Sequence, residues 1–281
     1  MRAIRRSWAL ASVLVFGLAL PVAAQPARAA PPPTDLAGFA QAFDEPFRSL
    51  SISGVPGTGA TWYNHTPWSG DFGDAVFAAP GQNGPFSPAP GGGLRITARK
   101  GPDGRWSSGL ISSRDRDGPQ GRGFIQQYGY FEMKAKLPSG PGVWPGFWLI
   151  GVDKHAVGAE IDVMEDYGRF PEYYHCVAHI WRLQGQNWAQ DFLINVRSGQ
   201  LSSGYNLFGV DIEDTVTTFY LNRKRVASMP TPPEYKQPFY ILADLALGGG
   251  WPIKFLSSPQ FMDVAYIRAY RRTGGPSGLS S

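Results

Sequence analysis

The sequence predicts an all-β protein, a β-sandwich of the jelly-roll type built from two antiparallel sheets. Its apolar residues recur with a period of two far more often than with the helical period of about 3.6. Clusters of Gly, Pro, Asn and Asp separate the apolar runs about every ten residues, as turns between strands do. Because the sequence shows no helical pattern between these runs, folds that alternate strands with helices are excluded.

The N-terminal residues 1–29 have the layout of a secretory signal peptide. Three arginines are followed by an apolar run (8–20) and then by small residues. Cleavage after Ala24 or after Ala29 satisfies the small-residue rule, and the paired arginines are compatible with twin-arginine export as well as with an ordinary charged start. We therefore expect a secreted protein, extracellular or periplasmic, and no membrane anchor.

Charge and cysteine content narrow the function further. Removal of residues 1–24 takes away three arginines and no acid, which lowers the formal net charge from +4 to +1. Since no basic cluster is left, nucleic acid is not an expected partner. The single cysteine, Cys176, excludes an internal disulfide, so an exported chain must be stabilised by its core alone.

The chain after the leader is predicted to form one domain. The Pro-, Gly- and Ser-rich residues 30–35 and 273–281 are expected to be flexible tails, and residues 36–272 the β-sandwich, acting as a monomer. The predicted strands, taken in chain order, are rich in β-branched and aromatic residues: residues 94–100, 127–137, 172–181, 191–196, 216–222, 239–247 and 264–270.

The stretch GAEIDVMEDYG (158–168) places three carboxylates, Glu160, Asp162 and Glu165, within six residues. In a regular strand, alternation puts Glu160 and Asp162 on one face and Glu165 on the other. A β-bulge at Met164 adds one residue and returns Glu165 to the first face. The sequence therefore predicts a bulged strand that carries all three acids on one face.

A solvated acidic strand edge is the alternative for these acids, because carboxylates also cluster on surfaces without a function. The aromatic and apolar residues 142–151, just upstream, argue against a solvated setting. Ile161 and Val163 alternate with the acids, as residues on the core side of a strand do. We expect these two side chains in the core, behind the carboxylates.

Four segments, in this order, resemble the glycoside hydrolases of family 16, the group of laminarinases, agarases and carrageenases. Residues 128–151 resemble the two strands before the catalytic one, and EIDVME (160–165) matches the family signature Glu-x-Asp-x-x-Glu in its bulged form. Residues 238–252 and 262–270 resemble the closing strands. The resemblance implies a concave sheet crossed by a sugar-binding cleft.

The same resemblance assigns catalytic roles to the acids. It implies that Glu160 is the nucleophile, Glu165 the general acid/base, and Asp162 a partner that tunes Glu160. Hydrolysis of a glycosidic bond needs one ionised carboxylate and one protonated carboxyl, and crowding drives pKa values apart in this way. With the bulge drawing Glu165 inward, we expect the separation of about 5 to 5.5 Å that is typical of retaining enzymes.

Four tryptophans and one histidine are predicted to bind substrate. His179 occupies the position where the family carries a histidine beside the catalytic acids. By alternation, Trp181 shares its face, and Trp144 and Trp148, four residues apart, share theirs. Trp251 lies in a glycine-rich loop, where packing does not easily explain an exposed ring.

The remaining tryptophans, His175 and the single cysteine are not assigned to substrate or metal binding by the same pattern. A cleft role and a packing role are both open for His175. No metal site is expected at Cys176 and His179, because alternation points them to opposite faces. The remaining tryptophans after the leader are predicted to pack in the core or against loops: Trp62, Trp68, Trp106 and Trp188.

The chain also departs from the laminarinase pattern. His155 stands where laminarinases carry a tryptophan, and residues 59–77 hold no match to their Asn-x-Glu-Leu-Gln element. The chain is in these respects more similar to the bacterial exopolysaccharide depolymerases of the family, the succinoglycan-type endoglycanases. Ala265 replaces an aspartate that is often a calcium ligand in the family, so no cofactor is expected, and Asp244 replaces a frequent asparagine.

The sequence thus predicts a secreted, endo-acting glycoside hydrolase that cleaves β-linked polysaccharide, here a bacterial exopolysaccharide, with retention of configuration. Two alternatives within the same family are a β-1,3(4)-glucanase and a transglycosylase. A third alternative is a carbohydrate-binding jelly roll without catalysis. That last alternative expects one or both glutamates of the signature to be replaced, whereas Glu160 and Glu165 are both present.

Overall fold

The computed structural model describes residues 35–68, 70–115, 122–153 and 157–273. The predicted signal peptide, most of both predicted tails and His155 lie outside these residues. Two short helical elements, α1 (Gln200–Ser203) and η2 (Pro233–Tyr235), accompany the strands. The strands are β1 (Phe39–Glu45), β2 (Ile52–Ser53), β3 (Trp62–Tyr63), β4 (Ala75–Phe77), β5 (Phe86–Pro88), β6 (Leu94–Lys100), β7 (Trp106–Ser108), β8 (Leu110–Ser112), β9 (Gly129–Lys136), β10 (Val143–Gly151), β11 (Val157–Glu165), β12 (Tyr173–Arg182), β13 (Trp188–Asn195), β14 (Asn206–Ile212), β15 (Val216–Leu221), β16 (Lys224–Pro230), β17 (Phe239–Leu247) and β18 (Gln260–Arg272).

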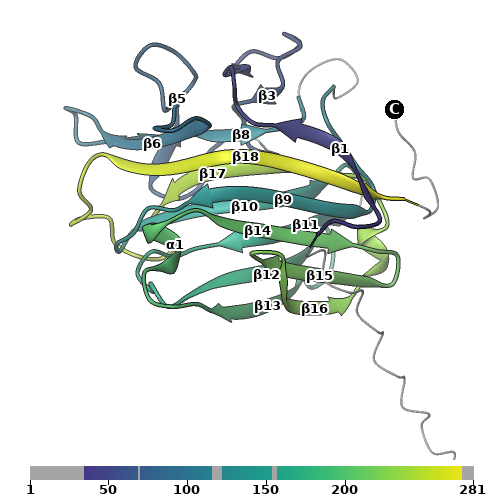
Figure 1. Ribbon diagram of the computed structural model, residues 1–281. Helices are drawn as coiled ribbons and strands as arrows, with labels where there is room; N and C mark the ends of the chain where they lie inside the picture. The colour runs from purple at the N-terminus through teal and green to yellow at the C-terminus, as the bar shows by residue number, and fades with distance from the viewer. Residues whose placement is uncertain (1–34, 69, 116–121, 154–156, 274–281) are drawn as a thin grey trace, which may run out of the picture.

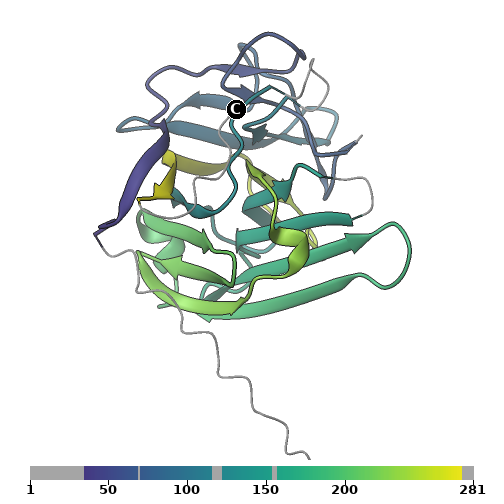
Figure 2. The ribbon, with the colours of Figure 1, turned by 90° about the vertical axis from the view of Figure 1, so that its right-hand side faces the viewer.

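The strands form two sheets that pack face to face, as the predicted β-sandwich requires. One sheet, called here the back sheet, has the order β16-β15-β14-β9-β18-β6-β7-β4, with β1 beside β18 and β5 beside β6. The other, the cleft sheet, has the order β13-β12-β11-β10-β17-β8-β3-β2. Figure 1 views the back sheet from its outer face, and Figure 2 shows the two layers after a turn of 90°.

Strand pairing is antiparallel except at two edges, which the sequence did not predict. The short strands β2 and β3 pair in parallel, as do β4 and β7. Parallel neighbours need a long connection between them, and the chain supplies it in residues 54–61 and 78–105. Both connections are longer than a hairpin turn, and the second contains β5 and β6, so these edge strands can run in the same direction.

The strands predicted from period-two patterns are confirmed, and those that were not predicted are mostly too short to show a pattern. Residues 94–100 and 239–247 coincide with β6 and β17. Strands β2 to β5, β7 and β8 have two or three residues each, which is less than one full alternation. The longer strand β14 was also missed, because it contains Asn206, Gly209 and Asp211, which are residue types that are depleted in strands.

The core fills the space between the sheets and follows the alternation of each strand. In β9, Phe131, Met133 and Ala135 are fully buried in the core, while Tyr130 and Glu132 point to the outer face of the back sheet. The core also takes in two of the tryptophans that were predicted to pack there, Trp62 and Trp106. No helix of the described residues is long and apolar enough to span a membrane.

Candidate active site

The strand with the three acids, β11, carries the predicted bulge. Its register shifts by one residue after Asp162 against β10, and again between Asp162 and Glu165 against β12. The additional residue returns the side chain of Glu165 to the face of Glu160 and Asp162. All three carboxylates line the same pocket, on the outer face of the cleft sheet.

The other side of β11 packs into the core, as predicted. Ile161 and Val163 are buried among core residues. Met164, the residue predicted at the bulge, is buried in the core as well and also reaches the floor of the pocket. Apolar packing on this side fixes the strand, so the carboxylates on the other side are held in place by a rigid element.

The pocket around the acids, called here the central pocket, has a volume of about 540 Å³. Its walls combine carboxylates with large rings and include none of the lysines or arginines in the described part of the chain. The acids are Glu160, Asp162, Glu165, Asp191 and Asp244, and the aromatic and imidazole rings are Trp68, Phe72, Trp144, Trp148, Tyr167, His179 and Trp181.

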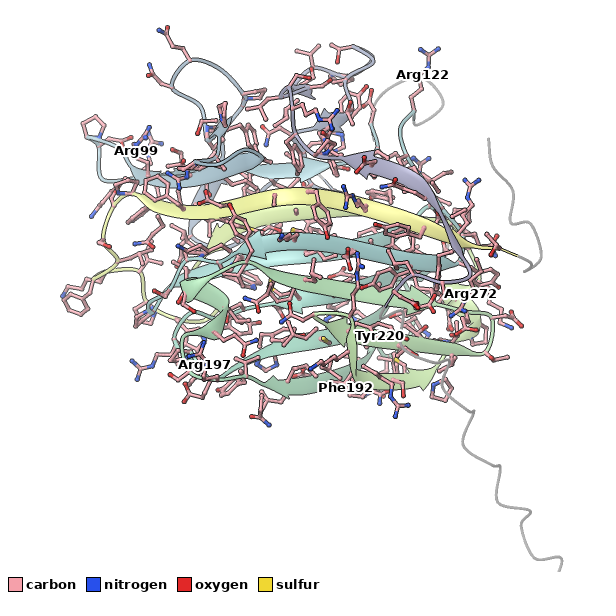
Figure 3. The ribbon with its side chains drawn as sticks, viewed as in Figure 1. Arg99, Arg122, Phe192, Arg197, Tyr220 and Arg272 are labelled. Atoms are coloured by element: carbon pink, nitrogen blue, oxygen red, sulfur yellow. The ribbon has the colours of Figure 1, made fainter. Side chains whose placement is uncertain are left out.

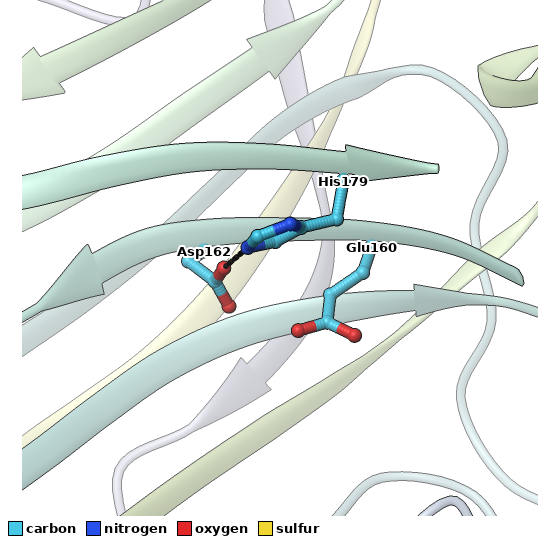
Figure 4. Close-up of side chains that lie close together, drawn as sticks. All are labelled: Glu160, Asp162 and His179. Atoms are coloured by element: carbon cyan, nitrogen blue, oxygen red, sulfur yellow. Dashed lines mark ion pairs between the residues drawn. The ribbon is translucent and has the colours of Figure 1, made fainter. Parts of the chain in front are cut away.

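Glu160 and Asp162 are contacted by two side chains of the neighbouring strand β12. Trp181 donates its Nε1–H to Glu160 Oε2 at 2.8 Å. The ring of His179 stacks on Trp181, with centroids 4.7 Å apart, and its Nε2 lies 3.2 Å from Asp162 Oδ2. Figure 4 shows Glu160, Asp162 and His179 facing one another. His179 and Trp181 therefore line the central pocket from one face of β12, as the alternation requires. Their role in substrate binding stays a prediction.

Glu165 is held by a different pair of donors. Both the Nε1–H of Trp144 and the hydroxyl of Tyr167 donate to the same atom, Glu165 Oε1, each at 2.9 Å. The two donor rings stack on each other with an angle of 20° between their planes. A side chain at Gly249 would collide with both rings, because its Cβ would lie 2.7 Å from Tyr167 and 2.9 Å from Trp144.

Burial raises the pKa values of the acids in the central pocket. Burial, with the negative charge of Asp162, raises the pKa of Glu160 to about 8. Burial, with the charges of Glu165 and Asp244, raises the pKa of Asp162 well above its usual range. The pKa of Tyr167 is also raised, by burial and by the charge of Glu165, so its hydroxyl remains a donor. Clustered, buried acids of this kind mark candidate catalytic sites.

Two further pockets adjoin the central pocket, and the three together are called here the groove. On the side of Glu160, a pocket of about 420 Å³ shares Trp68 and Trp181 with the central pocket and continues to Arg182. On the side of Glu165, a pocket of about 460 Å³ shares Trp144 and continues to Trp251. Trp251 is thus placed next to the central pocket and not within it, where it contacts Phe170 edge to face.

One prediction for the aromatic residues is wrong, and several cleft residues were not predicted, among them Phe72, Tyr167 and Asp191. Trp68 does not simply pack against a loop: 44% of its side chain is exposed, and it lines the central pocket. Phe72 lines the same pocket and contacts both Trp144 and Trp148 edge to face. Both come from the loops before β4, in the segment for which the sequence offered no match to the laminarinases.

The two remaining histidine and tryptophan predictions concern residues outside the central pocket. His175, for which both roles were open, contacts Asp191 through Nδ1 at 2.9 Å and packs edge to face on Tyr167. It therefore supports residues of the cleft without lining it. Trp188 is partly buried against the core, as predicted.

Among the described residues, the one cluster whose atoms are close enough to share a metal ion is Glu160, Asp162 and His179, with ligand atoms within 4.8 Å of one another. Cys176 and His179 point to opposite faces of β12, as predicted. Cys176 is buried in the core and donates to the carbonyl of Val163, whereas His179 lines the cleft.

Comparisons with known proteins place the chain in a family and agree with its fold. Residues 89–260 match the family described as Glycosyl hydrolases family 16. The chain is 27% identical over 261 residues to an endo-1,3-1,4-beta-glycanase, EglC, of Rhizobium meliloti, and 32% identical over 149 residues to a second one, ExsH, of the same organism. These matches cover 84% and 52% of the chain, but only 52% and 31% of the relatives.

The fold is shared with solved structures. The laminarinase catalytic domain of Thermotoga maritima superposes with a TM-score of 0.64 over 83% of this chain and 98% of that one, at 20% identity. The laminarinase of a Flavobacterium species gives a TM-score of 0.62 over 83% and 100% of the two chains, at 22% identity. The jelly roll, the bulged acid strand and the matched residues 89–260 together show that the chain belongs to glycosyl hydrolase family 16.

Proposed function

We propose that the protein is an endo-acting glycoside hydrolase that cleaves β-linked polysaccharide with retention of configuration. The observation that carries this proposal is the bulge of β11, because it brings two glutamates with different partners to one pocket. Glu165 accepts from Trp144 and Tyr167, and Glu160 accepts from Trp181. Two glutamates in unlike settings can divide the roles of acid and nucleophile between them.

Glu165 is suited to be the general acid. Since both donors act on Oε1, this oxygen is the carbonyl-like acceptor when the group is protonated, and the proton resides on Oε2. In this arrangement Oε2 carries the proton towards the sugar. In the first step it passes to the oxygen of the breaking glycosidic bond, and the leaving sugar departs on the Glu165 side of the groove.

Glu160 is suited to be the nucleophile once the shared proton lies on Asp162. The pKa values of both groups are raised, so together they retain a proton near neutral pH. The Nε1–H of Trp181 stabilises the ionised form of Glu160. Glu160 then attacks the anomeric carbon and forms a glycosyl-enzyme, and Glu165 takes a proton from the water that releases the sugar.

The groove supports endo action. Pockets adjoin the central pocket on the Glu160 side and on the Glu165 side, so a chain can extend beyond the cleavage point in both directions. Exposed rings at Trp68 and Trp181 line the way out on the Glu160 side. Aromatic rings with apolar faces and a polar edge suit the alternating surfaces of a sugar chain.

The charge of the groove limits the substrate. None of the described lysines or arginines lines the central pocket, so none of them balances the charge of an anionic sugar at the cleavage point. We infer a neutral β-linked sugar pair at this point of a bacterial exopolysaccharide, with any acidic substituent located beyond the central pocket. The relatives in Rhizobium meliloti, named endo-1,3-1,4-beta-glycanases, support a β-glycan of this kind.

A second candidate is a β-1,3(4)-glucanase that acts on laminarin, since the solved structures with this fold include laminarinases. We expect laminarin to be the poorer substrate, because the loops before β4 that carry Trp68 and Phe72 lack the laminarinase element. Transfer of the glycosyl group to a second sugar would use the same glycosyl-enzyme. The non-catalytic alternative is disfavoured by the presence of both glutamates.

The protein is also proposed to be exported, on the basis of the signal-like residues 1–29. N-terminal sequencing of the protein recovered from the culture medium or periplasm checks this directly. A mature chain that begins at Gln25 or Ala30 would support export with cleavage at one of the two expected positions. Recovery only of the intact chain inside the cell would contradict it.

A panel of polysaccharides assayed for new reducing ends tests the activity. It contains laminarin, mixed-linkage β-glucan, and neutral and acidic bacterial exopolysaccharides, each with the wild-type chain and with Glu160→Ala as a matched inactive control. We expect a rapid fall in polymer size with an exopolysaccharide, as endo cleavage produces. Cleavage of laminarin at the highest rate would favour the glucanase, and retention of activity in Glu160→Ala would overturn the mechanism.

A further inference from the structure

A fourth carboxyl, that of Asp244 on β17, faces the groove beside the acid motif. Its side chain is 2% exposed and lines the central pocket. Asp244 is paired with Gly146 of β10, and Gly146 is paired with Glu165 of β11, so the three positions form one row across the sheet. A Cβ at Gly146 would lie 3.0 Å from Asp244 Oδ1, and the missing side chain leaves a gap between the two carboxyls.

The partners of Asp244 are neutral donors. Its Oδ1 accepts from the Nε1–H of Trp148 at 2.8 Å, and its Oδ2 accepts from the backbone N–H of Ala246 at 3.0 Å. None of the ion pairs found among the described residues includes Asp244. A buried carboxyl without a cation is more stable in its neutral, protonated form.

The other groups around Asp244 favour the same protonation state. The titratable groups that face it are Glu165 and, further along β11, Asp162. The residues packed against it from β10 and β8, which include Trp148 and Leu110, carry no charge. Burial, with the charge of Glu165, raises the pKa of Asp244 to about 7, although the two hydrogen bonds act in the opposite direction.

We propose that Asp244 is a specificity residue that acts in its protonated form and donates its O–H to a sugar oxygen bound over Gly146. This inference rests on the proposed function, because it assigns a contact to the substrate of that groove. Each carboxyl oxygen already accepts from a protein N–H, so the proton is the strong polar contact that remains for a ligand. The protonated carboxyl of Asp244 therefore selects a sugar that has an acceptor oxygen over Gly146.

The proposal has a direct consequence for binding. As pH rises through the pKa of Asp244, the O–H is lost and a negative charge appears beside Glu165. The KM for a neutral substrate should therefore rise by about tenfold, because a hydrogen bond to substrate is replaced by an unpaired buried charge. Asp244→Asn cannot ionise, so its KM should stay level across the same range, although it can be higher at every pH because the amide NH2 cannot accept from the second of the two protein N–H groups.

The experiment measures KM and kcat separately between about pH 5.5 and about pH 9 for the wild type, Asp244→Asn and Trp148→Phe. The last variant keeps an aromatic wall but removes the donor to Asp244 Oδ1. Since that hydrogen bond stabilises the charged form, its loss should move the rise of KM to higher pH. We expect a rise in the wild type, a later rise in Trp148→Phe, and no rise in Asp244→Asn.

Two results would overturn the inference. One is a KM of Asp244→Asn that follows the pH dependence of the wild type. The other is a Trp148→Phe enzyme that copies Asp244→Asn, which would show that Asp244 only anchors Trp148. If the wild type cleaves no polysaccharide of the panel, the proposed function fails. The role of Asp244 is then decided by calorimetry: the affinity of the wild type, Asp244→Asn and Trp148→Phe for a neutral β-glucan oligosaccharide is measured over the same pH range and compared in the same way.

Discussion

The outer faces of the two sheets both bury carboxylates, but they stabilise them in different ways. On the back sheet, Glu132 is fully buried, and Arg223 donates two hydrogen bonds to its carboxylate, at 2.8 and 2.9 Å. The hydroxyls of Tyr130 and Tyr266 complete its partners, each at 2.9 Å. On the cleft sheet, Glu160 receives instead a single indole N–H from Trp181.

A second buried acid on the back sheet also has an arginine partner. Asp211 is fully buried and contacts Arg272, which also donates to Glu213 at 3.0 Å. Figure 3 labels Arg272 and Tyr220, and both lie towards the same end of the back sheet. Burial of a charge is tolerated when an arginine neutralises it with good geometry. Both back-sheet acids thus have an arginine partner, although the pairing of Asp211 is less complete: its Oδ1 has no hydrogen-bond partner, and burial raises its pKa to about 6.

The cleft sheet leaves its carboxylates without such a cation, so part of the burial cost appears as raised pKa values. A carboxyl that holds a proton near neutral pH can exchange it with a substrate. A carboxylate that is paired with an arginine has no proton to give. The difference between the sheets therefore separates acids that stabilise the fold from acids that are available for chemistry. The predictions below test that separation.

The largest expected effect is on activity. Glu160→Ala should lower kcat by at least about 10⁴-fold, because the nucleophile is absent. Glu165→Gln should lower it by about 10² to 10⁴-fold for a substrate with a poor leaving group. Neither change should lower the melting temperature. Glu132→Gln is the matched control, since it removes a buried acid of the back sheet, and full loss of activity in it would break the comparison.

The next largest effect is on stability. Arg223→Met leaves Glu132 buried without its cation and should cost about 3 to 5 kcal/mol of unfolding free energy. Arg268→Met is the control, because its partner Asp44 is half exposed and the pair contributes less than about 1 kcal/mol. Denaturant unfolding measures both, and equal costs would contradict the structural role of the Glu132 cluster.

Glu160→Gln should stabilise the protein at alkaline pH. Because the pKa of Glu160 is raised to about 8 in the folded chain, its contribution to stability is present below the unfolded pKa and lost as pH rises through about 8. The variant has no charge to bury. Its melting temperature should therefore match that of the wild type at about pH 5 and be about 3 °C higher at about pH 9. A lower melting temperature at alkaline pH would show that the charge of Glu160 is stabilised by the fold.

The smallest expected effect is a shift of a pH profile. In Asp162→Asn no negative charge can form next to Glu160 and no proton is shared between the two positions, so the pKa of Glu160 should fall and the acid limb of kcat/KM should move down by about one pH unit. The residual rate is measured on an activated substrate to keep it observable. An acid limb that stays in place would separate the ionisation of Glu160 from Asp162.

The sheet-borne half of the groove could be predicted from the sequence, for a physical reason. Alternation fixes the face of every residue in a strand, so His179 and Trp181, or Trp144 and Trp148, follow from one register. The bulge at Met164 was inferred because three acids in six residues fit one face only with an additional residue. These rules need no knowledge of distant contacts.

The loop-borne half could not be predicted in the same way. Tyr167 lies just after β11. Its hydrogen bond to Glu165 depends on the stacking of its ring on Trp144 and on the close approach of Gly249, so it needs contacts among three separate segments. Trp68 lies in a loop that pairs with no strand, where no period defines a face. The position of Tyr167, two residues after the last acid of the motif, was the one available signal for it.

The stereochemistry of hydrolysis tests the central claim most directly, because it reports whether the bulge of β11 brings Glu160 and Glu165 close enough for covalent catalysis. The measurement follows the first-formed anomer by NMR while the native enzyme hydrolyses the β-linked polysaccharide that it cleaves fastest. The account predicts that the β-anomer appears first and the α-anomer only later, by mutarotation. An α-anomer that appears first would mean that a water attacks directly, which would contradict the role of Glu160 as a nucleophile.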